Sequence, residues 1–570
     1  MSTIGENFSY SVLGYEKMVD ETINELKAEK IIDRIWEKDY TVWSNSPAEI
    51  SNRLGWLHSP ENSMASLSEI NKFVSEIKNE KYENALLLGM GGSSLAPEVL
   101  KNIYGFKTGS LQLSVLDSTD PGAILNMTNK YDPAKTLYIV STKSGGTIET
   151  ISFMKHFYNF VLGKLGAEEV TKHFIAITDP DSGLQRMAED LKFRKIFLND
   201  SNIGGRYSAL SLFGIVPAAL MGIDVEKLLS RALEAGDESK KEESISGTLG
   251  AILGTLAEKN IDKVTLVTSG QINPLGVWLE QLVAESTGKN GKGILPVESE
   301  SIESSEFYSK DRVFVYIKLK GDKTNDTKAQ LLRDAGFPFL EIIWNDLYDL
   351  GAEFMRWELA TAIASWKLKI QPFDQPNVES AKILARAMIN SYNLEGKLPL
   401  LNPIVKENGI MVYGDVVGKN IKDVLNGFLE ELSNKNIVPL KYLSLQAYLT
   451  PEDKTTKALQ ELRTKIQKKF KVATTVGYGP RFLHSTGQLH KGDSGNGLFI
   501  QFTSQIQQDV AIPEEAGKQE STLSFGTLIQ AQALGDLKAL QENKRKVIRF
   551  DLGNNVAGGI KKLSEMIELF

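Results

Sequence analysis

The chain has 570 residues, of which 42% are hydrophobic and 24% charged, a balance typical of a globular protein large enough for two or more domains. Lysine and arginine total 65 against 72 for aspartate and glutamate, and the net charge of -7 provides no overall basic field for nucleic acid or anionic lipid. The lack of cysteine excludes disulfides, thiolate zinc sites and thiol catalysis. The sequence has neither a signal-peptide core nor a run of about 18 apolar residues, so we expect a cytoplasmic protein without membrane or nucleic-acid partners.

Residues 1–50 are predicted to form a helical N-terminal arm that precedes a first domain over 51–240. In that domain short apolar runs alternate with helical stretches, which favours a doubly wound parallel sheet. The runs are 85–88, 111–116, 136–140, 174–178 and 195–198. Such sheets bind ligands beyond the carboxyl ends of their strands, so the loops that follow these runs are candidate sites.

A second sheet domain is predicted over 241–570, because the alternation resumes after a charged helical stretch. Its apolar runs are 264–267, 313–319, 339–344, 442–446, 472–476 and 498–502. We interpret residues 395–440 as an insertion with one helix near 421–432. The segment from Ser524 is predicted to form a helix, a strand at 547–552 and a helix that complete the domain. The expected fold is therefore α/β, with two doubly wound, three-layer, flavodoxin-like domains.

The loop Ser-Thr-Lys-Ser-Gly-Gly-Thr at 141–147 lies between an apolar strand and a helix start. Its glycines allow an anion to approach the backbone, and the hydroxyls of Thr142, Ser144 and Thr147 can donate to phosphate oxygens. The first N–H groups of the helix add positive potential. The nucleotide P-loop pattern is absent, which favours a phosphorylated small molecule over ATP. A tight strand-to-helix turn without a ligand is the alternative.

A second glycine-rich turn, Gly-Met-Gly-Gly-Ser-Ser at 89–94, follows the first strand of the sheet. By itself it suits a phosphate or a dinucleotide. A dinucleotide fingerprint would need a glycine where Ser94 stands, and Asp117 is the acid that could hold a ribose. Both ligand classes stay open on this turn alone.

Catalytic side chains are suggested in two further segments. Arg206, after Gly204 and Gly205, can stabilise an oxyanion or a phosphate near the same edge of the sheet, although a surface salt bridge would use the same residues. Gln281 and Glu285 share one face of a helix predicted to end at Gly288. The apolar neighbours of Glu285 would suit a general base. The alternative is a solvated or ion-paired glutamate, which is common at such positions.

The five histidines differ in what their surroundings indicate. His156 and His173 lie in a helical stretch and at a strand entry, and we interpret both as structural. His58 has no assignment. His484 and His490 lie between two strands, where a loop or short helix could bring one of them to the site. The pattern of a metal site is not found around them.

Taken together, these segments resemble the glucose-6-phosphate isomerase (phosphoglucose isomerase) family of paired sugar-isomerase domains. The motifs are the turn at 89–94, the loop at 141–150, Gly-Gly-Arg-Tyr-Ser at 204–208, Gln-x-x-x-Glu-Ser-x-Gly-Lys at 281–289, Phe-Asp-Gln-x-x-Val-Glu-x-x-Lys at 373–382 and Leu-His-Ser-Thr-Gly-Gln at 483–488. The resemblance is strongest to the isomerase part of bacterial transaldolase-isomerase fusions, and no transaldolase part is visible.

The resemblance implies reversible conversion of glucose 6-phosphate to fructose 6-phosphate without metal or nicotinamide. Glu285 would move a proton between C2 and C1, Arg206 would stabilise the cis-enediolate, and His484 with Lys382 would open the sugar ring. The substrate would be bound by Gly92, Ser93, Thr142, Lys143, Ser144, Thr147, Gly205 and Gln281.

Two departures from the family pattern stand out. His484 follows Lys382, whereas the family's histidine motif precedes the Phe-Asp-Gln motif, so the C-terminal part is rearranged. Gly146 stands where many members carry a threonine. The family is commonly a homodimer that takes this histidine from the neighbouring chain, but the changed order allows one chain to supply every group. A non-catalytic sugar-phosphate regulator and an isomerase of broader hexose 6-phosphate specificity are the alternatives.

Overall fold

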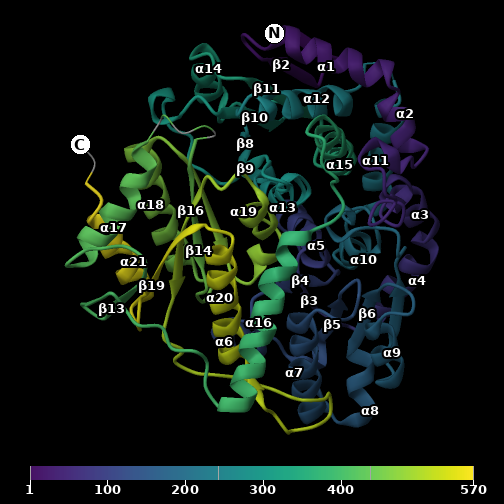
Figure 1. Cartoon of the computed structure of the whole chain (residues 1–570). Helices are drawn as coiled ribbons and strands as arrows, with labels where there is room; N and C mark the ends of the chain where they lie inside the picture. Colours follow the sequence, from purple (N-terminus) through teal and green to yellow (C-terminus); the bar gives the residue numbers. More distant parts are fainter. Residues whose placement is uncertain (1, 242, 435, 437, 439, 569–570) are drawn as a thin grey trace.

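The first sheet is built from the apolar runs of the predicted first domain (Figure 1). In the computed structural model, which describes residues 2–241, 243–434, 436, 438 and 440–568, each run is a strand. The strands are β3 (Asn84–Gly89), β4 (Gln112–Leu116), β5 (Thr136–Ser141), β6 (Phe174–Thr178) and β7 (Lys195–Leu198). All pair in parallel in the order β4-β3-β5-β6-β7, which is the predicted doubly wound arrangement, and their carboxyl ends share one edge.

Helices connect these strands and cover both faces of the sheet (Figure 1). They are α5 (Gly92–Tyr104), α6 (Pro121–Lys130), α7 (Ile148–Leu165), α8 (Ala167–Val170), α9 (Gly183–Asp190) and α10 (Leu212–Leu220), with α3 (Ser59–Ala65) and α4 (Leu67–Asn79) before them. Because α5 and α7 begin directly after the two glycine-rich loops, their N-termini point toward the edge where the strands end.

The second sheet contains a contribution that the sequence analysis did not anticipate. The predicted runs form β8 (Lys263–Thr268), β10 (Arg312–Leu319) and β11 (Phe339–Trp344), and β9 (Leu295–Val297) joins them. The N-terminal arm has the expected helices, α1 (Glu16–Ala28) and α2 (Ile31–Trp36), but it begins with β1 (Ser2–Ile4) and β2 (Phe8–Ser11). The sheet order is β1-β2-β11-β10-β8-β9. These first strands are short and partly polar, and antiparallel pairing holds them: β1 pairs with β2, and β2 pairs with β11.

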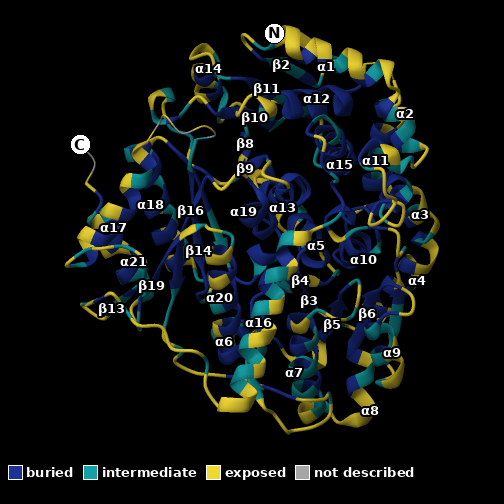
Figure 2. Cartoon of the chain, viewed as in Figure 1, coloured by how far each residue is buried: buried dark blue, intermediate teal, exposed yellow. Residues whose placement is uncertain are grey.

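Five helices accompany the strands of this sheet along the chain. They are α11 (Val225–Ser239), α12 (Ile245–Glu258), α13 (Leu275–Thr287), α14 (Asp326–Asp334) and α15 (Asp349–Lys367). Helices α12, α13 and α15 are buried along nearly their whole length, as the dark blue ribbons in Figure 2 show. Since a helix buried on all sides cannot shift without opening the core, α13 is a rigid support for the side chains that it carries.

Residues 241–570, predicted as one domain, contain a third sheet as well as the second. Its strands are β12 (Val405–Glu407), β13 (Ile410–Gly414), β14 (Tyr442–Ala447), β15 (Ala473–Tyr478), β16 (Gly497–Thr503) and β19 (Lys546–Asp551), in the order β12-β13-β19-β16-β14-β15. The segment interpreted as an insertion thus adds two strands to this sheet, together with the predicted helix, α17 (Ile421–Glu430). Apolar runs alone do not reveal which strands pair, so the division into two sheets was not predictable from them.

The remaining elements belong to a third region, built around the third sheet, which occupies the centre and left of Figure 1. They are α16 (Pro376–Glu395), α18 (Asp453–Phe470), α19 (Gly487–Gly492), β17 (Ala511–Ile512), β18 (Leu523–Ser524), α20 (Phe525–Glu542) and α21 (Val556–Glu565). The helix, strand and helix predicted from Ser524 are therefore confirmed. No helix in the described part of the chain combines the length and apolar character required to cross a membrane.

Buried apolar clusters tie the three regions together. One cluster contains residues of both the first and the second sheet, and another contains residues of the third sheet and the helices packed on it. A further cluster lies on the other face of the first sheet and includes Phe525 and Leu528 of α20. The ring of Phe525 stacks on that of Phe153 in α7, with the ring centroids 5.9 Å apart. Helix α20 is therefore packed against the first domain as well as its own, and burial of these rings stabilises that contact.

The turn at 89–94 needs glycine for packing against the Arg206 loop. A Cβ atom on Gly92 would lie 1.8 Å from the carbonyl oxygen of Gly205, far inside contact distance. We expect Gly92→Ala to push the two loops apart, lowering the melting temperature and raising KM at least several-fold. Gly204→Ala is the matched control, because its new Cβ would meet only ordinary contact, 3.7 Å from Cδ of Arg53. Equal melting temperatures for the two variants would contradict this packing argument.

Candidate active site

A cavity of about 300 Å³ lies beyond the carboxyl ends of β3 and β5 and is closed from the other side by α13 and α16. Its volume falls at the lower end of the usual range for small-molecule sites, about 300 to 1,000 Å³. Every residue predicted for the site lines it: Gly92, Ser93, Thr142, Lys143, Ser144, Thr147, Gly205, Arg206, Gln281, Glu285, Lys382 and His484. The structure thus brings together segments that are spread over most of the sequence.

The loop at 141–147 presents hydroxyls at one end of the cavity. The Thr142 and Thr147 hydroxyl oxygens are 3.1 Å apart, and the Ser144 hydroxyl accepts a hydrogen bond of 3.2 Å from the N–H of Gly146. Gly145 has a φ of +69°, and a Cβ there would lie 2.1 Å from the backbone nitrogen of Leu184. The loop is therefore fixed by close backbone packing, while its hydroxyls and the N-terminus of α7 face the cavity, as an anion site requires.

Lys143 lines the cavity, but its ammonium group is engaged elsewhere. It forms an ion pair with Asp179 at the end of β6 and donates a 2.7 Å hydrogen bond to the carbonyl of Ser201. The positive charge is largely balanced by that carboxylate. An anion at this loop would therefore meet mainly hydroxyls, backbone N–H groups and the helix N-terminus, with Lys143 adding a partly neutralised charge.

Arg206 and Glu285 meet at the centre of the cavity. The Arg206 Nη1 atom lies 2.8 Å from Oε1 of Glu285, and both side chains are buried, with 3% and 9% of their surface exposed. Gln281 donates a 3.1 Å hydrogen bond from Nε2 to Oε2 of Glu285, so each carboxylate oxygen has a partner. The predicted i, i+4 pair on α13 is thus in direct contact. A carboxylate held in this way has a fixed direction beside a fixed cation, which suits a general base.

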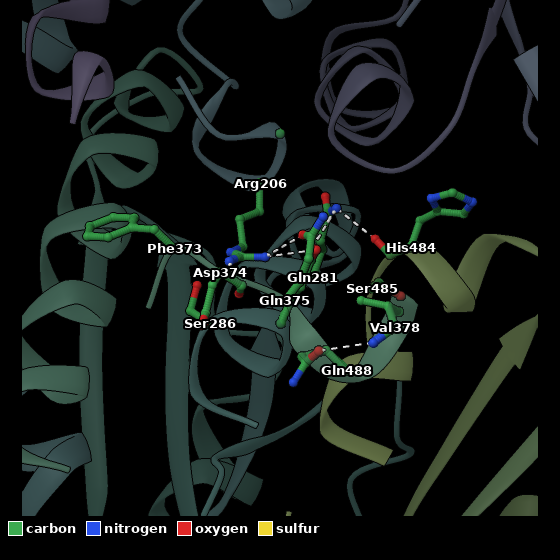
Figure 3. A network of polar contacts seen from close by, with 12 residues as sticks. Arg206, Gln281, Ser286, Phe373, Asp374, Gln375, Val378, His484, Ser485 and Gln488 are labelled. Atoms are coloured by element: carbon green, nitrogen blue, oxygen red, sulfur yellow. Dashed lines mark hydrogen bonds and ion pairs between the residues drawn. The ribbon is translucent and has the colours of Figure 1, made fainter. Parts of the chain in front are cut away.

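The guanidinium itself is held by the segment before α16. Its Nη2 donates 2.8 Å hydrogen bonds to the carbonyls of Pro372 and Asp374, and Nη1 donates to the Gln375 side-chain oxygen at 3.1 Å (Figure 3). Behind this segment Lys289 pairs with the Asp374 carboxylate at 2.7 Å. Burial, and then the charge of Arg206, lower the pKa of Lys289 to about 7. The Phe-Asp-Gln motif therefore fixes the orientation of Arg206.

His484 reaches the same cavity from the third region. Its backbone carbonyl accepts a 2.7 Å hydrogen bond from Gln281 Nε2, and its imidazole extends away from Arg206 (Figure 3). The ring's Nε2 lies 3.1 Å from Oε1 of Glu149, in the first turn of α7. Burial raises the pKa of Glu149, but the charge and hydrogen bond of His484, with a smaller effect of Lys382, hold the pKa below its usual value. The carboxylate is thus ionised and can orient the imidazole.

Arg481, just before His484, attaches this loop to the first domain. Its guanidinium forms ion pairs with Glu98 of α5 and, at 2.9 Å, with Asp117 after β4. Asp117 is the acid that a dinucleotide would need for its ribose. Because Arg481 pairs with the Asp117 carboxylate, that carboxylate is not available to bind the ribose of a dinucleotide. The turn at 89–94 instead faces the cavity that contains Arg206.

Several lining residues were missed by sequence reasoning. Glu49 and Arg53 come from the segment after the arm helices, where Arg53 pairs with Glu49 at 2.7 Å, and no local pattern marks them. Gln375 belongs to a quoted motif but received no role. Glu149, which does not line the cavity but contacts His484, lies within the quoted 141–150 segment and received no role. Lys382 is less tightly held than the other predicted groups, since its ammonium lies 3.9 Å from the carboxylate of Glu379.

Comparison with known proteins points to one family. The model of phosphoglucose isomerase matches residues 70–302, which include the phosphate loop, Arg206 and Glu285. Glucose-6-phosphate isomerases of Campylobacter jejuni and Thermus thermophilus are 26% and 27% identical to the chain; the alignments span 60% and 59% of it and 93% and 90% of those proteins. The chain is similar to the phosphoglucose isomerase family.

Solved structures agree with the phosphoglucose isomerase fold. A hypothetical protein of Thermus thermophilus has a TM-score of 0.59 at 23% identity, covering 67% of this chain and 99% of that one. A glucose-6-phosphate isomerase of Chlamydia trachomatis has a TM-score of 0.58 at 16% identity, covering 70% and 90%. His484 and Lys382 lie outside the residues that the phosphoglucose isomerase model matches, so their assignment depends on their place in the cavity.

Proposed function

We propose that the chain catalyses the reversible isomerisation of glucose 6-phosphate to fructose 6-phosphate. The observation that carries this proposal is the buried contact between Glu285 and Arg206, a base and a cation at 2.8 Å, in the cavity that also contains the phosphate loop. A base beside a fixed positive charge is what proton transfer next to a carbonyl needs. The names of the most similar relatives point to the same reaction.

Phosphate binding would orient the sugar along the cavity. The hydroxyls of Ser93, Thr142, Ser144 and Thr147 and the N-terminus of α7 hold the phosphate, which fixes the distance from it to C1 and C2. Glu285 removes the C2 proton of the open-chain aldose and returns it to C1. Between these steps the substrate is a cis-enediolate, and the guanidinium of Arg206 stabilises its negative charge.

Ring opening would be the task of His484. A proton must leave the C1 hydroxyl and one must reach the ring oxygen as the bond between that oxygen and C1 breaks. Because Nε2 faces the Glu149 carboxylate, Nδ1 is the ring nitrogen that would exchange a proton with the sugar. Lys382 lines the same side of the cavity and would assist by charge.

A coupled assay of fructose 6-phosphate formation tests the proposal. Turnover from glucose 6-phosphate supports it, whereas binding of the sugar phosphate without turnover would make the chain a regulator. Competition among several hexose 6-phosphates, mannose 6-phosphate included, would measure whether specificity is broad. The cytoplasmic location and a homodimer remain predictions from the sequence and the family resemblance.

One chain supplies every group that we assign to the reaction, including the histidine. We therefore expect the specific activity to stay constant when the protein is diluted from micromolar to nanomolar concentration, even where a dimer dissociates. Sedimentation at the same concentrations reports the oligomeric state. A fall in specific activity that follows dissociation would show that a second chain completes the site.

A further inference from the structure

Glu149 is contacted by two side chains through a single oxygen atom. Its Oε1 lies 3.1 Å from Nε2 of His484 and accepts a 2.7 Å hydrogen bond from Nε2 of Gln532, in α20. Glu149 and Gln532 are buried, with 5% and 4% of their surface exposed. The carboxylate that orients the imidazole is therefore itself held by an amide from a helix near the end of the chain, far from both in the sequence.

Thr119 fixes which way this amide points. Its hydroxyl donates a 2.7 Å hydrogen bond to Oε1 of Gln532, and Thr119 is fully buried at the end of β4. With the amide oxygen engaged as an acceptor, the NH₂ group must face Glu149. A chain of hydrogen bonds thus runs from Thr119 through Gln532 and Glu149 to His484, and its first three members have their side chains removed from solvent.

The same face of α20 also fixes the backbone that carries the histidine. Asp536, one turn after Gln532, forms a 2.7 Å ion pair with Lys491 in α19, and both side chains are fully buried. Helix α19 begins three residues after His484. Since α20 also packs on α7 through Phe525 and Phe153, it contacts both the helix that carries Glu149 and the helix that follows His484.

We propose that Gln532 is a positioning residue for the ring-opening step, acting through Glu149 on His484. This proposal rests on the proposed function. The amide is a neutral donor, so it holds the Glu149 carboxylate in place without cancelling its charge. The charged or titratable groups facing that carboxylate are then His484, from the loop before α19, and Lys382, from α16. Nε2 keeps its proton toward Glu149, and Nδ1 is held ready to exchange a proton with the sugar.

Exchange between the α and β anomers of glucose 6-phosphate, followed by NMR, measures ring opening without isomerisation. The experiment uses the full chain with Glu285→Gln, so that the ring opens and closes but the C2 proton stays. Adding Gln532→Met replaces the amide by an apolar side chain of similar size, and we expect anomer exchange to slow about tenfold. This is less than the roughly 100-fold or more that a general acid-base contributes, because the imidazole itself remains. The Kd for glucose 6-phosphate should not change. Gln532→Glu, which places a second carboxylate against Glu149, should slow exchange at least as much.

Gln530→Met is the matched control, because Gln530 lies on the exposed face of the same helix. It should leave anomer exchange, Kd and melting temperature unchanged. If Gln532→Met unfolds, Thr119→Val, which frees the amide oxygen, is expected to slow exchange by a smaller factor. If the folded Gln532 and Thr119 variants exchange anomers as fast as the Glu285→Gln parent, the proposal is overturned. It is also overturned if that parent does not accelerate anomer exchange although the wild-type chain isomerises. Failure of the wild-type chain to form fructose 6-phosphate would instead refute the proposed function.

Discussion

Glu285→Gln should lower kcat for isomerisation by about 1,000-fold, within the range that general acid-base catalysis contributes. The amide cannot accept the C2 proton, but its oxygen can still accept the hydrogen bond from Arg206, although it loses the one from Gln281; these bonds hold the native carboxylate at 2.8 and 3.1 Å. The cavity should keep its shape, and glucose 6-phosphate should bind with nearly unchanged Kd. The coupled assay measures kcat, and calorimetric titration measures binding.

Glu280→Gln is the control for this experiment. Glu280 is on the same helix and is also buried. Its pKa is raised well above the usual value by burial and then by the charge of Glu298, which favours the neutral carboxyl that glutamine mimics. We expect a change in kcat of less than about threefold, corresponding to about 0.6 kcal/mol. A loss of only a few-fold in the Glu285 variant, or equal losses in the two variants, would show that Glu285 is not the base.

Arg206→Ala should lower kcat by about 30- to 1,000-fold, which corresponds to about 2 to 4 kcal/mol of transition-state stabilisation. The guanidinium is fixed by the carbonyls of Pro372 and Asp374, so it meets the developing enediolate charge without having to reorganise. Because the charge develops only after substrate has bound, KM should change much less than kcat. Steady-state kinetics in both directions would measure the two parameters.

Removal of Arg206 also leaves Glu285 without its cationic partner, so a second variant is needed to separate the two effects. Arg206→Lys retains the charge near Glu285 but loses the fork that reaches the backbone carbonyls and Gln375. We expect an intermediate kcat for Arg206→Lys if fixed geometry matters as well as charge. A rise in KM at constant kcat in both variants would make Arg206 a substrate-binding residue instead.

Local sequence patterns predicted most of the strands and most of the residues that we assign to the reaction. Each apolar run predicted as a strand is a strand, because buried parallel strands need continuous apolar residues. The loop at 141–147 and the Gln281 and Glu285 pair could be recognised because the required residues are adjacent or one helical turn apart. The strands β2 and β13 could not be recognised, since they are short and pair with β11 and β19, which are distant in the sequence.

The sequence by itself determined which segments carry the phosphate loop, the base and the arginine, and the family that they resemble. Only the tertiary structure decided which partners those groups meet. Lys143 is drawn to Asp179, Glu149 holds His484, and Gln532 reaches Glu149 from the end of the chain. The first contact joins neighbouring loops of the first sheet, and the other two reach that domain from the third region. Tertiary packing sets all three, so no local pattern of residues encodes them.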